Sequence, residues 1–584
     1  MIWKLIFLSS FVYYCSIFCQ LVNGQVTLEI DVPDKSSLLI TPRLIELAKK
    51  TSTISPTNDP ATGCKICEEV IGNIISLRRS NATREVMRDY LYYLCLLYTR
   101  DGPVGCKKVD TLIDIVLYII DHKEDLRPER FCAIYFIQYQ CKDPNADDWT
   151  IPLPSYPAEV VKPDIKNDDG KFLQILQITD VHVDPQYTPG SNAKCSEPLC
   201  CESGIPDNDD NAAGYWADYH VCDMPWHTME NVLETINKTN ENLDYIYFTG
   251  DIVSHRIWDT SEKNNSETIK KFLGVLETNF PNITVFPILG NHEPHPADAY
   301  SPESVDKNSN VSSQWLFDLV AEEWSKWLPS DTQTTIRKGG YYTVLVKPGF
   351  RIIALNSNVC FRQNFWLVFE NNDTYDQLKW LVDVLSQAEK NGEKVHLLAH
   401  VPVTDEYYSC TQVWSRELTK IILRFSGTIS AQFNGHTHSD EFKLFFNSSK
   451  VTSVGYNGAS FSTFVGNNPN YRIYQVDSKN LTVTDYSEYI FNVSAAISSL
   501  SPPKWYKLYS FKDAYDLPDL TLESLETLYT QMKSNNTDNQ IVDLYYRFRS
   551  RDSEPSNEEG CNLKCKQYIV CLASASDAIE SVSC

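Results

Sequence analysis

Residues 245–255 read YIYFTGDIVSH, a short apolar run that stops at Gly250 and Asp251. Five other runs share this design and also end in polar loops: FLQILQIT (172–179), VFPILG (285–290), RIIALN (351–356), KVHLLAH (394–400) and AQFNG (431–435). Amphipathic stretches separate them, for example residues 229–240 and 375–392. Alternating strand and helix signals predict an α/β domain, which we place at residues 169–485. The loops just past the strand ends are where such folds place their chemistry.

Five short motifs lie at the ends of these runs, in the order ITDVH, TGDIVSH, LGNHE, LLAHVP and NGHTH. They hold six of the 11 histidines, and their candidate functional residues are Asp180, His182, Asp251, His255, Asn291, His292, Glu293, His400, His436 and His438. Each motif alone is a weak indication, because Asp-x-His after a strand is common and a lone histidine is more often structural. As a set, they supply the histidine, carboxylate and amide ligands that a two-metal phosphoester site needs.

The ordered set D-x-H, GD, GNH, H and GHxH resembles the calcineurin-like metallophosphoesterases. The resemblance implies two packed sheets flanked by helices, with two divalent metals about 4 Å apart that clamp the attacking and leaving oxygens of a phosphate ester. It assigns Asp180, His182 and His438 to the first metal, Asn291, His400 and His436 to the second, and Asp251 as the bridge. A metal-bound hydroxide would attack phosphorus, without a covalent intermediate on the protein.

Two further histidines receive catalytic roles from the resemblance. His292 would hydrogen-bond the phosphate or protonate the leaving oxygen, and His255 resembles a second acid found in acid sphingomyelinases. A solvated loop histidine is the alternative for His255. Two zinc ions are expected because His-rich ligation suits zinc, with manganese or iron left open. A purple acid phosphatase would need a tyrosine ligand where this chain has Ile252 and Val253.

A unit of six cysteines precedes the α/β domain: Cys64, Cys67, Cys95, Cys106, Cys132 and Cys141. The stretches between them place apolar residues at helical spacing, which predicts an all-α domain over residues 60–145. The pattern resembles saposin-type domains, which bind lipids. A bundle whose apolar stripes form only its own core is the alternative, and the four other cysteines disfavour a zinc or redox role for C-x-x-C. Four prolines within residues 146–168 predict a semi-rigid linker.

The N-terminus has one lysine before an apolar run, and small residues near Gly24 predict a cleaved signal peptide at residues 1–24. A signal anchor is disfavoured because Cys, Tyr and Ser weaken the run. Residues 25–60 read as a leader, and residues 486–584 predict a mainly helical, Cys-rich C-terminal domain. Secretion fits 16 cysteines after the signal and ten Asn-x-Ser/Thr glycosylation sites: Asn81, Asn237, Asn264, Asn282, Asn310, Asn372, Asn447, Asn480, Asn492 and Asn535.

The complete arrangement resembles the acid sphingomyelinase family over nearly all of the mature chain. The resemblance implies eight disulfides: Cys64–Cys141, Cys67–Cys132, Cys95–Cys106, Cys195–Cys200, Cys201–Cys222, Cys360–Cys410, Cys561–Cys565 and Cys571–Cys584. It implies hydrolysis of sphingomyelin to ceramide and phosphocholine, in lysosomes or outside the cell, on membrane or lipoprotein surfaces reached through the saposin-type domain. Two departures are visible: the loop from His400 to Cys410 is longer than the family's, with Val403 after Pro402, and Gln363 stands where Glu is expected.

Two alternatives to a sphingomyelinase stay open. Related phosphodiesterases act on nucleotide phosphoesters but lack the saposin-type domain, and a non-catalytic lipid-binding protein would have lost metal ligands. The formal net charge of -24 argues against nucleic-acid binding, which needs Lys and Arg at the phosphates. No later stretch reaches the roughly 18 apolar residues of a spanning helix, and nothing demands more than a monomer. An acidic optimum is expected, although low pH favours imidazolium forms that cannot bind metal.

Overall fold

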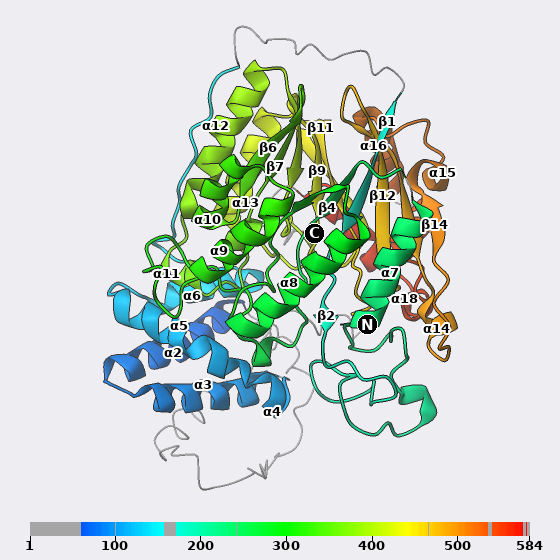
Figure 1. Cartoon of the computed structure of the whole chain (residues 1–584). Coiled ribbons are helices and arrows are strands. Elements are labelled where there is room, and N and C mark those ends of the chain that lie inside the picture. The colour runs from blue at the N-terminus through cyan, green and yellow to red at the C-terminus, as the bar shows by residue number, and fades with distance from the viewer. Residues whose placement is uncertain are drawn as a thin grey trace.

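The computed structural model describes residues 60–99, 101–156, 171–240, 242–464, 466–534, 540–575, 580 and 584. The predicted signal peptide, the leader up to residue 59 and residues 157–168 of the predicted linker lie outside this part of the chain. Within it, two sheets form the centre of the molecule, and helices cover them (Figure 1).

Both sheets have six strands. The order of the first is β14 (Tyr506–Ser510), β13 (Val483–Ile490), β12 (Asn470–Asp477), β1 (Phe172–Ile178), β4 (Tyr245–Phe248) and β5 (Thr284–Pro287). The order of the second is β10 (Glu441–Asn447), β11 (Lys450–Asn457), β9 (Ile429–Asn434), β8 (Lys394–Leu398), β7 (Phe350–Ala354) and β6 (Tyr342–Lys347). The sheets pack through aromatic rings, because Tyr247 and Tyr474 of the first lie 5.0 and 4.9 Å from Phe433 of the second. A short pair, β2 (Val183–Asp184) and β3 (Met224–Pro225), lies beside them.

The six apolar runs noted in the sequence form β1, β4, β5, β7, β8 and β9. β1, β4 and β5 are parallel to one another, and so are β7, β8, β9 and β11. The carboxyl ends of parallel strands meet at one edge of a sheet, where α/β folds place their ligands. All five candidate motifs therefore emerge at such edges.

Helices flank the sheets because their apolar residues recur on one side. In α12 (Gln377–Lys390) the buried residues Leu378, Leu381, Leu385 and Ala388 follow helical spacing and face the core. The other helices of this region are α7 (Trp226–Thr239), α8 (Glu262–Asn279), α9 (Gln314–Glu323), α10 (Gln333–Gly339), α11 (Trp366–Phe369) and α13 (Gln412–Arg424).

The N-terminal region is helical and has a core of its own. Its helices are α2 (Pro60–Arg79), α3 (Arg84–Tyr98), α4 (Gly102–Gly105), α5 (Lys108–His122) and α6 (Pro128–Tyr135). Arg130 attaches it to the central domain by donating to the carbonyls of Val368 and Leu367 at 2.5 and 3.3 Å. Residues 146–156 follow without a helix or strand, and Trp149 Nε1 donates to the Asn371 carbonyl at 2.9 Å. The linker is thus held against the central domain where the structure describes it.

The C-terminal boundary differs from the prediction. Residue 485 falls inside β13, and β14 extends the first sheet further, so residues 486–510 belong largely to the sheet domain. The sequence TVTDYSEYI was not predicted as a strand, because a strand near a sheet edge buries only alternate residues and has polar residues between them. Short helices α14 (Val493–Ala496) and α15 (Phe511–Tyr515) interrupt this part.

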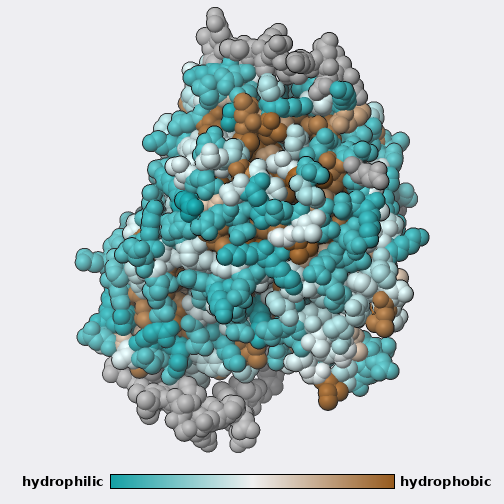
Figure 2. Space-filling view, in the orientation of Figure 1, coloured by the Kyte–Doolittle hydropathy of each residue, from teal (hydrophilic) through white to brown (hydrophobic). Residues whose placement is uncertain are grey.

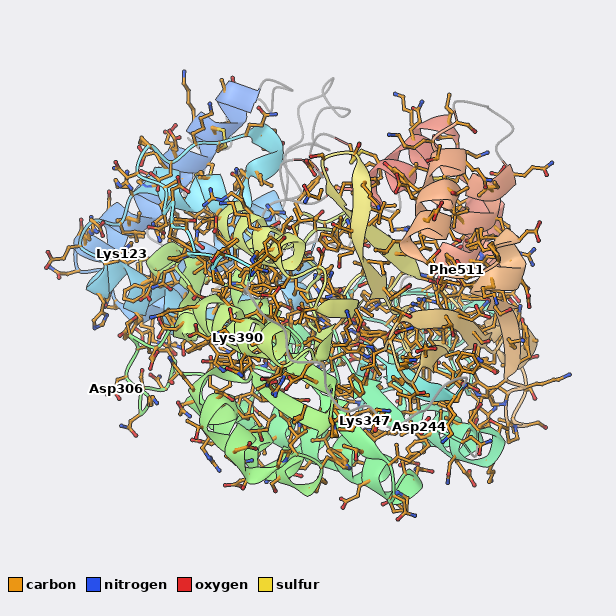
Figure 3. The ribbon with its side chains drawn as sticks, turned by 90° about the horizontal axis from the view of Figure 1, so that it is seen from above. Lys123, Asp244, Asp306, Lys347, Lys390 and Phe511 are labelled. Atoms are coloured by element: carbon orange, nitrogen blue, oxygen red, sulfur yellow. A yellow bond between two sulfur atoms is a disulfide. The ribbon has the colours of Figure 1, made fainter. Side chains whose placement is uncertain are left out.

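Four helices do follow: α16 (Leu522–Met532), α17 (Gln540–Arg549), α18 (Glu554–Glu559) and α19 (Leu563–Leu572). Their side chains Leu525, Val542 and Ile569 join the same hydrophobic core as the sheets rather than a separate one. Seen from above, the N-terminal helices near Lys123 and the C-terminal region near Phe511 lie on opposite sides of the molecule (Figure 3). The C-terminal helices therefore form a layer on the central domain and share its core.

The structure contains the eight disulfides in the pairing that the resemblance implied. Eight of the ten glycosylation sites are exposed: Asn81, Asn237, Asn264, Asn282, Asn310, Asn372, Asn447 and Asn480. Asn492 is partly buried and caps α14 by accepting from Ala495 N, and Asn535 lies outside the described residues. None of the described helices combines the length and the apolar character needed to cross a membrane.

Candidate metal centre

The seven candidate metal ligands converge at the carboxyl ends of β1, β4, β5, β8 and β9. Five of them have left-handed backbone, with φ of 51° at Asp180, 42° at His182, 62° at Asp251, 74° at His436 and 54° at His438. Residues other than glycine rarely adopt this conformation, and it persists where the surroundings impose it, commonly at functional sites. The fold thus accepts local strain to bring these side chains together.

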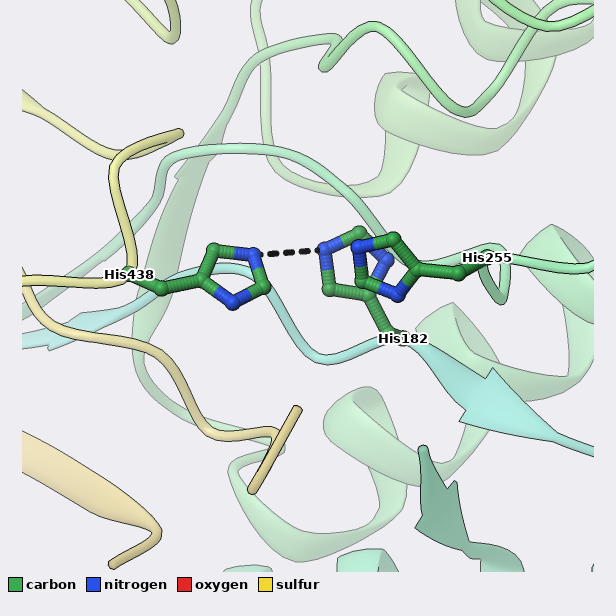
Figure 4. A group of neighbouring side chains, drawn as sticks. All are labelled: His182, His255 and His438. Carbon is green, nitrogen blue, oxygen red and sulfur yellow. Dashed lines mark hydrogen bonds between the residues drawn. The ribbon is translucent and has the colours of Figure 1, made fainter. Parts of the chain in front are cut away.

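Three ligands form the first group. His182 Nε2 lies 3.0 Å from His438 Nε2, and His438 Nε2 lies 3.5 Å from Asp180 Oδ1. Figure 4 shows His182 between His438 and His255, with the dashed line joining the two ring nitrogens. His182 Nε2 is also 3.6 Å from Asp251 Oδ2, so that carboxylate borders this group.

The second group shares the same carboxylate. Asn291 Oδ1 lies 3.0 Å from His400 Nε2 and 2.9 Å from His436 Nδ1. His400 Nε2 lies 3.2 Å from Asp251 Oδ2, the oxygen that also faces His182. Asp251 therefore stands between the two groups, where a bridging ligand belongs.

The outer nitrogens of these rings show which nitrogen faces the centre. His182 Nδ1 lies 2.8 Å from the Val253 carbonyl, and His400 Nδ1 lies 2.7 Å from the Thr249 carbonyl. A carbonyl can only accept, so each Nδ1 carries the proton and each Nε2 turns a lone pair toward the centre. Metal-binding histidines are held in this way by a second partner, so the side chains present fit a pair of divalent cations.

Electrostatics favour the neutral, metal-binding form of three of the four histidines. Burial lowers the pKa of His182 and His438 well below the ordinary value and that of His436 to about 3, which keeps the rings neutral. Burial also acts to lower the pKa of His400, but Asp251 and Asp180 outweigh it and raise that pKa to about 9. A cation held by His400 and Asp251 would take the place of that proton.

The two candidate acids stand beside the first group. The His292 amide donates to Asp251 Oδ1 at 2.9 Å. The centre of the His292 ring lies 4.7 Å from the centre of the His255 ring. His255 Nδ1 lies 2.8 Å from Asp223 Oδ1, and the His255 ring stacks on Phe464 at 3.7 Å. His255 is therefore fixed on two sides rather than free in a loop.

Sequence comparison agrees with this geometry. The calcineurin-like phosphoesterase family matches residues 173–440, and the acid sphingomyelin phosphodiesterase C-terminal region matches residues 440–584. A sphingomyelin phosphodiesterase of Bos taurus is 31% identical over 528 residues, covering 88% of this chain and 82% of the relative. The chain belongs to the sphingomyelin phosphodiesterase family.

Two further relatives show how far the similarity extends, and one of them has a different activity. Sphingomyelin phosphodiesterase A of Dictyostelium discoideum is 34% identical over 536 residues, with 87% of this chain and 88% of the relative covered. A cyclic GMP-AMP phosphodiesterase of Bos taurus is 29% identical over 432 residues, with 70% of this chain and 90% of the relative covered. Membership of the calcineurin-like phosphoesterases implies a divalent metal centre.

In this member of the sphingomyelin phosphodiesterase family, one residue that supports the candidate ligands lies within a motif noted in the sequence. Glu293 of LGNHE is buried and accepts from the amides of Gly290 at 2.5 Å and Asp251 at 3.1 Å, besides that of Ile252. It fixes the turn that carries the Asp251 carboxylate. Its place beside His292 in the motif was the signal, although the sequence suggested no role for it.

Other supporting residues were missed. Asp223 follows Cys222 without a motif, Asp298 accepts from Asn291 Nδ2 at 2.8 Å, and Arg551 donates to the carbonyl of His438. These residues are distant in sequence from the ligands they support or lie in loops without pattern. The chain folds them into place only through tertiary contacts, so no local signal exists.

A cavity of about 330 Å³ opens from the metal centre into the N-terminal helices. At one end it is lined by Asp251, Asn291, His292, His436 and His438. At the other end it is lined by apolar residues of the N-terminal core, among them Ile74, Leu91, Ile113, Val116, Ile120 and Phe131. Gln363, which replaces the expected Glu, also lines it, as does Phe365. One cavity is thus bordered both by the candidate metal ligands and by the apolar residues of the helical region.

Proposed function

We propose that this protein hydrolyses sphingomyelin to ceramide and phosphocholine with two zinc ions. The cavity carries the proposal, because it joins a phosphoesterase centre to an apolar space suited to lipid chains. The face seen in Figure 2 is mostly hydrophilic, with apolar residues only in small groups, so an apolar substrate finds its partners inside rather than there. Sphingomyelin phosphodiesterases at about 31% identity over most of the chain support the same substrate.

The proposed ligands are those found together: Asp180, His182 and His438 for one zinc, Asn291, His400 and His436 for the other, and Asp251 between them. When bound, the metals would stabilise charge on the phosphoryl oxygens and lower the pKa of the attacking water. Zinc suits a site with four imidazoles.

The protein's own residues then protonate the leaving group. Water adds to phosphorus while the bond from phosphorus to the ceramide oxygen breaks, and that oxygen needs a proton. His255 offers Nε2, because Asp223 occupies Nδ1 at 2.8 Å. His292, held at its amide by Asp251, lies within reach of the same space and hydrogen-bonds the phosphate. His255 Nε2 gives this oxygen its proton and recovers one from the attacking water, and phosphocholine and ceramide depart.

The domain roles complete the proposal. Residues 60–145 act as a saposin-type domain that takes a lipid chain into its core, residues 146–168 link it, and the catalytic domain extends to about residue 510 rather than 485. We further propose that a signal peptide at residues 1–24 directs the chain to lysosomes or the exterior, and that it acts as a glycosylated monomer on membrane or lipoprotein surfaces.

The nucleotide alternative is less well supported. The cyclic GMP-AMP phosphodiesterase relative covers 70% of this chain, whereas the sphingomyelin phosphodiesterase of Bos taurus covers 88%. A nucleotide would also leave the apolar end of the cavity without a function. A non-catalytic lipid-binding role conflicts with a complete ligand set.

The proposal is tested with purified protein, choline-labelled sphingomyelin vesicles near pH 5 and metal analysis by mass spectrometry. We expect about two zinc ions per chain and phosphocholine release that a chelator abolishes. His292→Ala should abolish turnover and keep the metal, whereas His220→Ala, outside the cavity lining, should leave turnover unchanged. Bound metal with turnover of cyclic GMP-AMP instead would favour the nucleotide alternative, and no metal at all would refute catalysis.

A further inference from the structure

The loop between His400 and Cys410 reaches back to the metal centre. Ser409 is buried, and its Oγ lies 3.0 Å from His436 Nε2. Since His436 Nδ1 faces Asn291, Nε2 is the outer nitrogen, and Ser409 is its hydrogen-bond partner. His182 and His400 use main-chain carbonyls for this purpose, whereas His436 depends on a side chain carried by a loop.

Contacts inside the loop fix the position of Ser409. Asp405 Oδ1 accepts from the amides of Tyr407 at 2.8 Å and Ser409 at 3.1 Å, which closes the loop into a compact turn. The disulfide Cys360–Cys410 anchors its far end. Ser409 thus has little freedom to move away from His436.

The C-terminal helices hold the same loop from outside. Tyr568 of α19 donates its hydroxyl to the Glu406 carbonyl at 3.1 Å. Arg549 of α17 lies 2.9 Å from Glu406 Oε2 and 2.7 Å from Glu441 Oε1, so its charge binds the loop to β10. The side chains of Arg549 and Glu406 are largely buried, which makes this pair stronger than an exposed one.

We propose that Ser409 is a positioning residue of the metal centre, and that the C-terminal helices act on His436 through it. The inference rests on the proposed function, because it takes His436 as a metal ligand. The Ser409 hydroxyl keeps the proton on Nε2 and the lone pair of Nδ1 toward the metal. Without it, the ring can turn or exchange its tautomer, and the affinity for the second metal falls.

The test is Ser409→Ala in the full-length glycosylated protein, with zinc affinity measured by competition against a chelator. We expect the dissociation constant of one zinc to rise roughly 10- to 100-fold, the range seen when an outer partner of a metal ligand is removed. Excess zinc should restore kcat, because the fold itself is kept. The matched control is Ser415→Ala: Ser415 is also buried, but its Oγ has no hydrogen-bond partner within the described part of the chain.

Tyr568→Phe tests the link to the C-terminal helices, because it removes only the hydroxyl that holds Glu406. We expect Tyr568→Phe to lower zinc affinity less than Ser409→Ala does. The double variant of Tyr568→Phe and Ser409→Ala should bind zinc as tightly as Ser409→Ala alone, because the two residues act in series. Losses that multiply would overturn the route through Ser409. If the parent binds two zinc ions and Ser409→Ala binds them equally well, the inference fails while the proposed function stands. If the parent binds none, the proposed function fails first.

Discussion

Asp405 gives a quantitative prediction of how stability depends on pH. Its side chain is 2% exposed, and Oδ2 has no hydrogen-bond partner among the described residues. Burial raises its pKa from 3.8 to about 6, against the opposing effect of the hydrogen bonds from Ser409 and Tyr407. Asp405→Asn keeps the shape and the accepting oxygen but removes the titration.

The sign follows from the direction of this pKa. A folded-state pKa above the unfolded value means that the folded protein binds the proton more tightly, so the stabilisation is complete below pH 3.8 and disappears as pH rises through about 6. The gap between 3.8 and about 6 corresponds to about 3 kcal/mol, at about 1.36 kcal/mol per pKa unit. Relative to the parent, Asp405→Asn should therefore gain about 2.4 kcal/mol of unfolding free energy between pH 4 and pH 7.

The assay is denaturant unfolding of metal-free parent and variant at a series of pH values, so that metal release does not contribute. Asp519→Asn is a control of opposite sign, because hydrogen bonds from Ser524 and Thr521 lower the pKa of that surface carboxyl. It should lose stability relative to the parent as pH rises from 3 to 5. Parallel curves for Asp405→Asn and the parent across pH 4–7 would show that Asp405 does not titrate as argued.

Three further predictions concern the site. Val116→Trp should fill the apolar end of the cavity and lower turnover of sphingomyelin in vesicles by about tenfold or more. Turnover of a water-soluble phosphodiester is the control. An equal loss on both substrates would contradict the role of the cavity. Asp223→Asn should lower kcat by about 10²–10⁴-fold with both metals retained, because His255 loses the partner that orients it, and unchanged kcat would remove His255 as an acid. Arg551→Met should destabilise the protein by about 1.5–3 kcal/mol and lower its zinc affinity, because the charged donor to the His438 carbonyl is lost. Denaturant unfolding and chelator competition measure the two effects. Unchanged zinc affinity would make the role of Arg551 purely structural.

The sequence predicted the strands and the candidate ligands that converge after them, because both signals are local. An apolar run that ends in Gly-Asp needs no distant information, and parallel strands bring their carboxyl ends together. The supports of the ligands carry no such signal. Ser409 and Asp223 act on His436 and His255 across 27 and 32 residues of chain, and only the closed fold sets those distances.

The C-terminal boundary failed for a related reason. β14 is the edge strand of the first sheet and β13 lies next to it, and in β13 only alternate residues from Asp485 to Ile490 are buried, a pattern that resembles a loop. The extension has a functional consequence as well. It brings residues 540–575 against the catalytic domain, so that Arg551 and Tyr568 contact the segments that carry His438 and Ser409.

Activity in acid conflicts with metal binding only if the ligands are free to protonate. Burial lowers the pKa of His182 and His438 well below the ordinary value and that of His436 to about 3, so burial favours the neutral, metal-binding form of these rings. His400 is the exception, because Asp251 and Asp180 outweigh burial. At that position a bound metal would replace a proton, and Asp251, 3.2 Å from His400 Nε2, would attract the metal as it attracts the proton. The same burial that excludes water from three histidines would thus let a divalent metal centre persist at a pH where exposed imidazoles would release the metal.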